Sequence, residues 1–249
     1  YGGLALPRLT SGVKVLLLVN GAVFLANAVL AGGLGVWLGL SWSGLWQGYG
    51  LGLLRLLTYQ VVHAFEDPGH ILFNMLVLYF FGTMVEEGIG RRRLLELYVA
   101  AGVAGGLLQI LLEALLGNPG RGIVGASGAC YGILVYAACM QPRARVIFFI
   151  LLVELRWLAL ILVLIGVYMT YVELRTGGST GVAHTAHVGG ALWGWVAYRW
   201  LGRRRRWRRS CSRRCCPRAA AFLSRRCFAT CASSGAGTNI NGLLHMKGL

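Results

Sequence analysis

Four polar side chains interrupt apolar stretches of this sequence: His70, Asn74, Ser127 and His187. Polar groups are costly inside apolar spans, so such residues are the first candidates for a function. A serine hydroxyl is inert at neutral pH until a nearby base accepts its proton, and histidine, with an ordinary pKa of about 6.5, is suited to that task. Ser127 and His187 are therefore candidates for a nucleophile and its general base.

The surroundings of these residues favour chemistry, although each signal is weak alone. His70 and Asn74 are four residues apart, so on a helix both side chains project from one face, as two interfacial caps also would. Ser127 lies between Gly125 and Gly128 at the start of an apolar stretch. The free N–H groups of a helix start suit a developing oxyanion, but a serine there is ordinarily a cap.

Small residues flank both candidate catalytic residues. Gly128 and Gly132 follow Ser127, and Gly190 and Gly194 follow His187, each pair with GxxxG spacing. Such faces let helix backbones approach closely, which short side chains on two different helices need if they are to meet. The pattern alone usually indicates only packing.

The elements that must position these residues are membrane helices. Hydrophobic residues make up 57% of the chain and charged residues only 13%, with a mean hydropathy of +0.64, so a soluble domain is disfavoured. We predict an all-α membrane protein with six transmembrane helices, near residues 13–32, 70–87, 93–116, 125–141, 156–173 and 185–201. The sequence begins at Tyr1, and its N-terminal apolar stretch is interpreted as a retained first helix.

Two connections are expected to lie at the membrane surface. Residues 33–69 are too polar and broken to span but are rich in tryptophan, so we expect a half-embedded loop. Val146 to Leu155 is apolar but adjoins Glu154 and Arg156, so it is interpreted as an interfacial connector. Basic residues concentrate in alternate connections, which by the positive-inside rule predicts that both termini are cytoplasmic.

The end of the chain differs in composition from the rest. All 8 acidic residues precede Arg203, which leaves residues 1–202 with a net charge of +4 and residues 203–249 with +12. We expect residues 1–202 to form one domain and residues 203–249 a basic, Cys-containing, disordered cytoplasmic tail. A nucleic-acid partner is not predicted, and the cysteine spacing predicts no metal site.

Four segments of the chain resemble the rhomboid protease family: HILFN at 70–74, VEEGIGRRR at 85–93, GASGACYG at 125–132 and AHVGG at 186–190. Their order and approximate spacing agree with the family over roughly residues 52–201. The chain departs from the family pattern at Leu54-Arg55, where Trp-Arg is frequent, and in a slightly longer interval between His63 and His70.

The resemblance implies a rhomboid-like six-helix bundle and a role for each matching residue. It assigns Ser127 as nucleophile, His187 as base, and His70, Asn74 and the Ser127 backbone N–H as supports of the oxyanion. Tyr131 corresponds to an aromatic residue that packs on the catalytic imidazole, and Glu86 is expected to form a structural ion pair or cap. We expect His63 to have a structural role in its loop.

The expected function is that of an intramembrane serine endopeptidase. It would cleave transmembrane segments of membrane-protein substrates through an acyl-enzyme formed by a Ser-His dyad, without a cofactor. A non-proteolytic rhomboid relative that binds membrane-protein clients is the alternative, and a transporter or channel is a more distant one. The expected location is a bacterial inner membrane, and the sequence predicts neither the identity of the substrate nor an oligomeric state.

Overall fold

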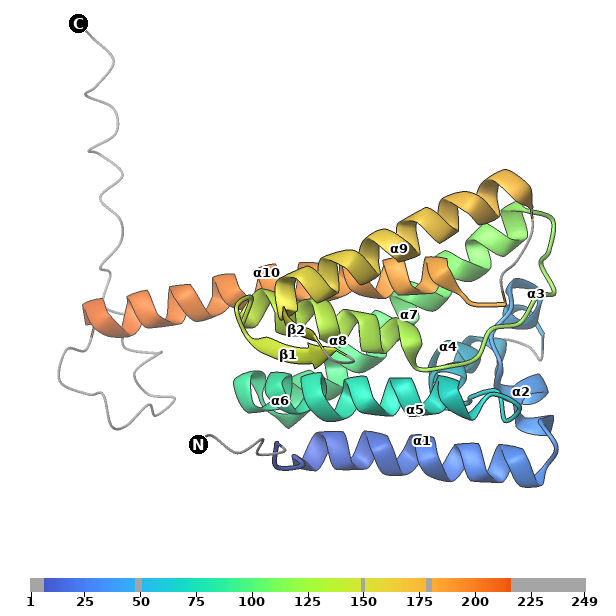
Figure 1. Cartoon of the computed structure of the whole chain (residues 1–249), viewed down its shortest axis with the longest axis horizontal. Helices are drawn as coiled ribbons and strands as arrows, with labels where there is room; N and C mark the ends of the chain where they lie inside the picture. The colour runs from blue at the N-terminus through green and yellow to red at the C-terminus, as the bar shows by residue number, and fades with distance from the viewer. Residues whose placement is uncertain (1–6, 48–50, 149–150, 178–180, 216–249) are drawn as a thin grey trace, which may run out of the picture. The chain divides into compact units, whose positions relative to one another are not determined.

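The computed structural model describes residues 7–47, 51–148, 151–177 and 181–215. Within them, helices occupy all six ranges predicted as apolar spans (Figure 1). They are α1 (Ser11–Val29), the continuous series α5 (Pro68–Val77), η3 (Leu78–Gly82) and α6 (Thr83–Ile89), α7 (Arg91–Leu115), α8 (Ser127–Met140), α9 (Leu155–Thr176) and α10 (His184–Cys215). Four of the six, namely α1, the series α5 to α6, α7 and α9, are long and apolar enough to cross a membrane. The mainly helical membrane fold is confirmed, and six crossings remain a prediction.

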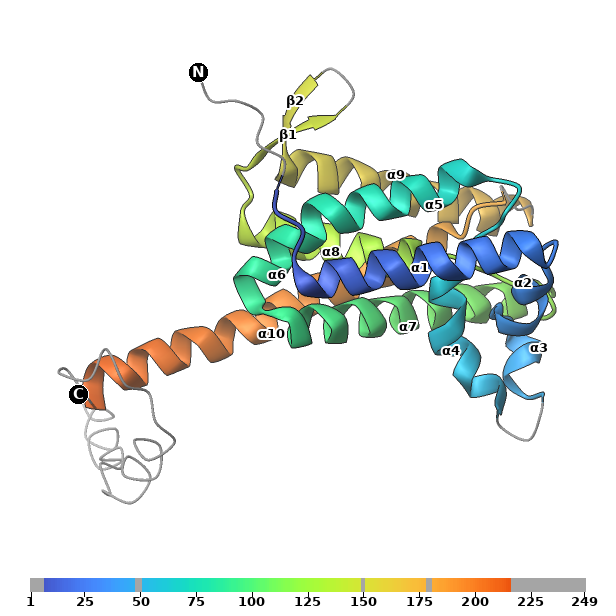
Figure 2. The same cartoon turned by 90° about the horizontal axis from the view of Figure 1, so that it is seen from below.

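Among the four long apolar helices, α7 is the most buried. Half of the apolar window of α7 is buried, compared with 28% for α1 and 22% for α9. Figure 1 shows α1 and α9 on opposite sides of the bundle, and Figures 1 and 2 both show α1 running alongside α5. Most of the unburied apolar side chains of α9 are exposed, as expected of a helix that contacts lipid.

The connection after α1 folds into short helical turns instead of a simple loop. They are α2 (Gly33–Leu38), α3 (Trp42–Leu45), η1 (Leu51–Leu54), α4 (Arg55–Thr58) and η2 (Tyr59–Val61). Trp37 and Trp46 are 74% and 68% exposed, which is consistent with the predicted location at the membrane surface because exposed tryptophan is favoured there.

The connector between α8 and α9 is a β-hairpin, which the sequence analysis did not predict. Strands β1 (Arg145–Phe148) and β2 (Leu151–Glu154) pair antiparallel, with Arg145 opposite Glu154. Figure 2 shows the hairpin projecting from the bundle beside the start of α9. Pairing as a hairpin gives hydrogen-bond partners to the backbone N–H and C=O groups of an apolar connector that is not helical.

Polar contacts hold both ends of α1. The carboxylate of Glu86, at the end of the second long helix, accepts hydrogen bonds from the hydroxyls of Thr10 and Ser11 and from the backbone N–H groups of Gly12 and Val13. At the other end, the side-chain amide of Asn27 donates to the carbonyl oxygen of His63 over 3.0 Å. Glu86 thus has the second of its two predicted roles, a helix cap.

The chain separates into two compact units, Tyr1–Arg199 and Trp200–Leu249. Helix α10 continues beyond its predicted end at residue 201 and ends at Cys215. Residues 216–249 lie outside the described part of the chain. The division at residue 202 and the disorder of the tail therefore remain predictions.

Candidate active site

Ser127 is the first residue of α8, with Ala126 as the residue before the helix, and its side chain is half-buried. The backbone N–H groups of this first turn have no partner within the helix and point toward its N-terminal end. Two residues earlier, Gly125 has a φ of +123°, and a side chain there would lie 2.7 Å from Nε2 of His70. Only glycine therefore fits between the imidazole of His70 and the segment that leads into Ser127.

His63 supports the same segment from the other side. Its side chain is fully buried, and its Nε2 accepts a hydrogen bond of 3.3 Å from the backbone N–H of Ala126. Burial, with a contribution from neighbouring His70, lowers the pKa of His63 to about 4, so the ring is neutral at pH 7 and can accept. The sequence analysis predicted a structural role for His63 but not its contact beside the candidate nucleophile.

His70 and Asn74 lie in the first two turns of α5, which begins at Pro68. Asp67 caps this helix by accepting from the backbone N–H of His70 over 3.3 Å. The ring of His70 meets that of His63 edge to face, with centroids 5.1 Å apart. Asn74 is 6% exposed, and its Nδ2 donates to the carbonyl oxygen of His70 over 2.9 Å. Since an amide nitrogen carries two hydrogens, the second remains for another acceptor.

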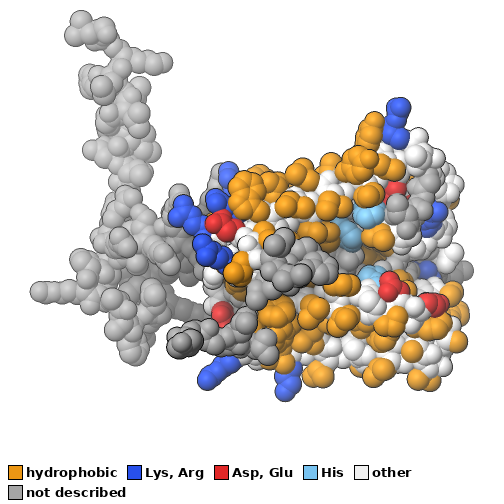
Figure 3. Space-filling model, viewed as in Figure 1, with side chains coloured by type: hydrophobic (Ala, Val, Ile, Leu, Met, Phe, Trp, Pro, Cys, Tyr) orange, Lys and Arg blue, Asp and Glu red, His pale blue; other side chains and the backbone are white. Residues whose placement is uncertain are grey.

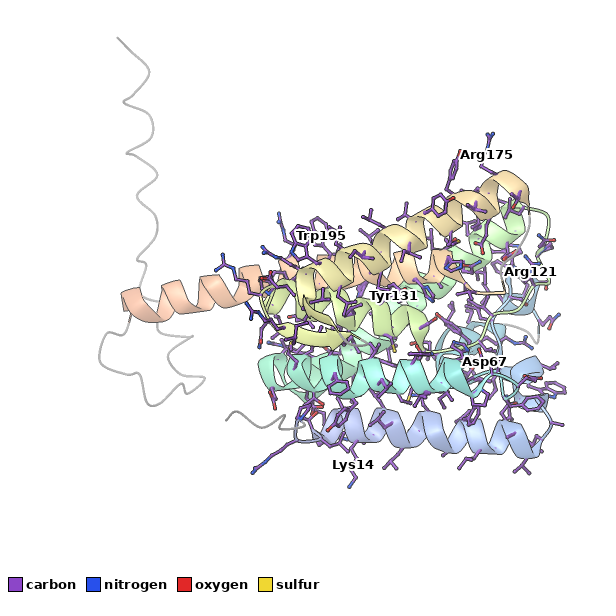
Figure 4. All side chains as sticks on the ribbon, viewed as in Figure 1. Lys14, Asp67, Arg121, Tyr131, Arg175 and Trp195 are labelled. Carbon is purple, nitrogen blue, oxygen red and sulfur yellow. The ribbon has the colours of Figure 1, made fainter. Side chains whose placement is uncertain are left out.

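His187 is the fourth residue of α10 and is 8% exposed. Its ring stacks on that of Tyr131, with centroids 4.3 Å apart and planes 5° apart. Figure 4 labels Tyr131 in the middle of the bundle, between α9 and α5. The ring of His184 meets His187 edge to face at 5.8 Å. The stacking therefore fixes the plane of the imidazole.

Glycines bring α8 and α10 into backbone contact. A side chain added at Gly190 would overlap the carbonyl oxygen of Gly128, and one at Gly194 would overlap that of Gly132. A side chain at Gly128 would lie 3.2 Å from the carbonyl oxygen of Ala186. Because Gly128 follows Ser127 and Gly190 lies three residues after His187, the two helices are in backbone contact next to Ser127 and about one turn after His187.

The Ser127 hydroxyl and the His187 imidazole are not hydrogen-bonded to each other among the described residues, and Nδ1 of His187 is buried without a partner. Catalytic hydrogen bonds are often long in free enzymes and shorten when substrate binds. Figure 3 shows histidine side chains close together on one face, among hydrophobic side chains. Within the described ranges, no cluster of His, Cys, Asp and Glu side chains has the geometry of a metal site.

A family model described as the Rhomboid domain matches residues 51–204, more than half of the chain. This chain belongs to the rhomboid family. It is 30% identical over 170 residues to RHOMBOID-like protein 12, mitochondrial, of Arabidopsis thaliana, a match that covers 61% of this chain and 48% of that protein.

Two bacterial rhomboid proteins are also similar. Rhomboid protease GluP of Bacillus subtilis is 29% identical over 148 residues, covering 59% of this chain and 26% of that protein. Rhomboid protease GlpG of Haemophilus influenzae is 27% identical over 146 residues, covering 57% of this chain and 68% of that protein. The match thus spans half or less of the first two relatives. Family membership and the apolar helices identify a multi-pass integral membrane protein.

The sequence analysis missed two polar residues of α7. Gln109 is 2% exposed and Glu113 is 5% exposed, and both lie in α7, the most buried of the four long apolar helices. A signal was available, because polar and ionisable residues within a predicted span are functional candidates by default.

Proposed function

We propose that this rhomboid chain is an intramembrane serine endopeptidase in which Ser127 attacks the scissile peptide bond and His187 acts as general base. The observation that carries the proposal is the backbone contact between α8 and α10 beside Ser127 and His187, together with the stacking of Tyr131 on the imidazole. The names of the bacterial relatives, both rhomboid proteases, support the same activity.

The reaction follows from the chemistry of these groups. His187 accepts the proton of the Ser127 hydroxyl as Oγ attacks the carbonyl carbon, and the carbonyl oxygen becomes an oxyanion. Donors for that oxyanion are the Ser127 backbone N–H, the His70 ring and the free hydrogen of the Asn74 amide. The C–N bond then breaks, and His187 gives its proton to the leaving amine. Water, deprotonated by His187, hydrolyses the acyl-enzyme and regenerates the serine.

The proposed substrate is a membrane protein cut within or beside a transmembrane segment. A site at the starts of α5, α8 and α10 lies near one membrane surface if these helices span as predicted, so water can reach it from that side. Both termini would then lie on the opposite, cytoplasmic side.

The test is proteolysis by the purified full chain in liposomes, with a labelled single-span substrate and a fluorophosphonate probe that reacts with activated serine. We expect wild type to cleave and to be labelled, and Ser127→Ala to lose both. Ser43→Ala, which removes a hydroxyl from the first connection, should keep both. Cleavage by Ser127→Ala would reject the nucleophile. A folded wild type that binds the substrate but neither cuts it nor is labelled would favour the non-proteolytic alternative.

A further inference from the structure

A series of polar contacts, called here the polar chain, links Arg121 through Glu113 and Gln109 of α7 to Ala186 at the start of α10. Glu113, near the C-terminal end of α7, pairs with Nη1 of Arg121, which lies 3.3 Å from its Oε2. Its Oε1 also accepts a hydrogen bond of 3.2 Å from the side-chain amide of Gln109, one helix turn earlier. A carboxylate that is 5% exposed is costly unless it is paired in this way.

Gln109 extends the chain to the helix that carries His187. Its Oε1 accepts a hydrogen bond of 3.2 Å from the backbone N–H of Ala186. The same N–H group also lies 3.1 Å from the carbonyl oxygen of Ala183, so the bond is shared. The bond to Glu113 orients the amide of Gln109 with its oxygen toward Ala186, because the amide nitrogen is the only group that can donate to the carboxylate.

Arg121 extends the chain in the other direction, to the segment that leads into Ser127. Two residues later, Ile123 exchanges backbone hydrogen bonds of 3.0 and 2.8 Å with Leu40. Gly125 then donates to the carbonyl oxygen of Tyr59 over 2.9 Å. Figure 4 shows Arg121 toward the same end of the bundle as Asp67, where α5 begins. The approach to Ser127 is therefore held by backbone hydrogen bonds at Ile123 and Gly125, two and four residues after Arg121.

We propose that Gln109, Glu113 and Arg121 are positioning residues that set the start of α10, and with it His187, against the segment that presents Ser127. This inference rests on the proposed function, and none of the three residues contacts the reacting atoms. Their effect is on geometry: the ion pair fixes the carboxylate, the carboxylate orients the amide, and the amide holds the backbone one residue before the base.

A role in stability alone makes a different prediction. If these residues only hold the bundle together, their loss reduces the fraction of folded enzyme but leaves each folded molecule as reactive as before. If they position His187, the folded molecules themselves react more slowly. Fluorophosphonate labelling separates the two, because its final amplitude counts competent sites and its rate constant reports how strongly His187 activates Ser127.

The experiment labels the purified full chain and three variants: Gln109→Leu, Glu113→Gln and the double variant. We expect Gln109→Leu to lower the labelling rate constant by roughly 10- to 100-fold, the effect of misplacing a reacting group by a fraction of an ångström to 1 Å, with an amplitude near that of wild type. Glu113→Gln should cause a smaller loss. The double variant should be little slower than Gln109→Leu, because the two residues act through one path.

Glu96→Gln is the matched control, since it neutralises the exposed ion pair between Arg92 and Glu96 on the same helix. It should leave both the labelling rate constant and the amplitude unchanged. A reduced amplitude with an unchanged rate constant in Gln109→Leu would overturn the positioning role. If the losses of rate in the two single variants add fully in the double variant, Gln109 and Glu113 do not act through one path.

Hydrogen exchange of the peptide 183–190 gives a readout that does not need activity. Gln109→Leu should speed exchange there, because the Ala186 N–H loses an acceptor. Unchanged exchange would overturn the contact itself. A folded wild type that is not labelled would instead reject the proposed function. Gln109, Glu113 and Arg121 would then have no catalytic base to position.

Discussion

Replacement of Gly190 by alanine tests whether close helix contact is what brings Ser127 and His187 together. The new methyl group would overlap the carbonyl oxygen of Gly128 and would lie 3.1 Å from its Cα. Both of these atoms belong to the backbone of α8, so no side-chain rotation relieves the overlap. The two helices must move apart, or α10 must shift along its axis.

The size of the effect follows from the contact. Ordinary contact between a carbon and its neighbour begins near 3.5 Å, so the helices must separate by on the order of 1 Å. Such a displacement of reacting groups costs about 10²-fold in rate. Overpacking at the contact costs about 1–3 kcal/mol of stability. We therefore expect activity to fall much more than the amount of folded protein.

The assay compares substrate cleavage and fluorophosphonate labelling in liposomes with thermal unfolding of the same preparation. Gly21→Ala is the matched control, because Gly21 also lies within a helix, α1, and a side chain there meets nothing within 4 Å. It should be as active as wild type and stabilised by about 0.5–1 kcal/mol, the helix preference of alanine over glycine. A Gly190→Ala enzyme with the kcat and labelling rate of wild type would refute the reasoning.

Two further substitutions test other contacts. Glu86→Gln should lower the melting temperature, because an amide offers one acceptor oxygen where the carboxylate has two, and the loss of stability should be about 1–3 kcal/mol. Glu87→Gln, at the exposed neighbouring residue, should leave the melting temperature unchanged. Equal shifts in the two variants would argue against the cap. Tyr131→Leu should lower kcat by up to about tenfold through loss of ring stacking, while Tyr131→Phe should stay close to wild type. If Phe is as slow as Leu, the hydroxyl and not the ring is what matters.

Hydropathy located the long helices, but it could not locate their ends. The fourth predicted span began at residue 125, whereas α8 begins at Ser127, because Gly125 adopts a positive φ that a helix excludes. The hairpin was missed because a short apolar run such as 146–153 has no periodicity that separates a strand from a buried helix.

The sequence placed Ser127 and His187 near helix starts, beside glycines that bring the two helices together, and their catalytic roles remain predictions. The contacts that support these residues were not predictable from the sequence. His63 meets Ala126 across 63 positions of sequence, and only the folded first connection brings them together. Gln109 and Glu113 lie in the third span, outside the short motifs, and the contact of Gln109 with the start of α10 joins residues 77 positions apart.

The caps on α1 have a consequence for life in a bilayer. Lipid tails are as apolar as leucine side chains, so they can replace protein side chains at the apolar face of a peripheral helix. Apolar packing alone therefore holds such a helix only weakly against the bundle. No hydrocarbon chain can substitute for the Glu86 carboxylate at one end or the Asn27 amide at the other. Polar groups therefore hold both ends of the first helix against the bundle, and this association should change little when the fatty-acid composition of the membrane changes.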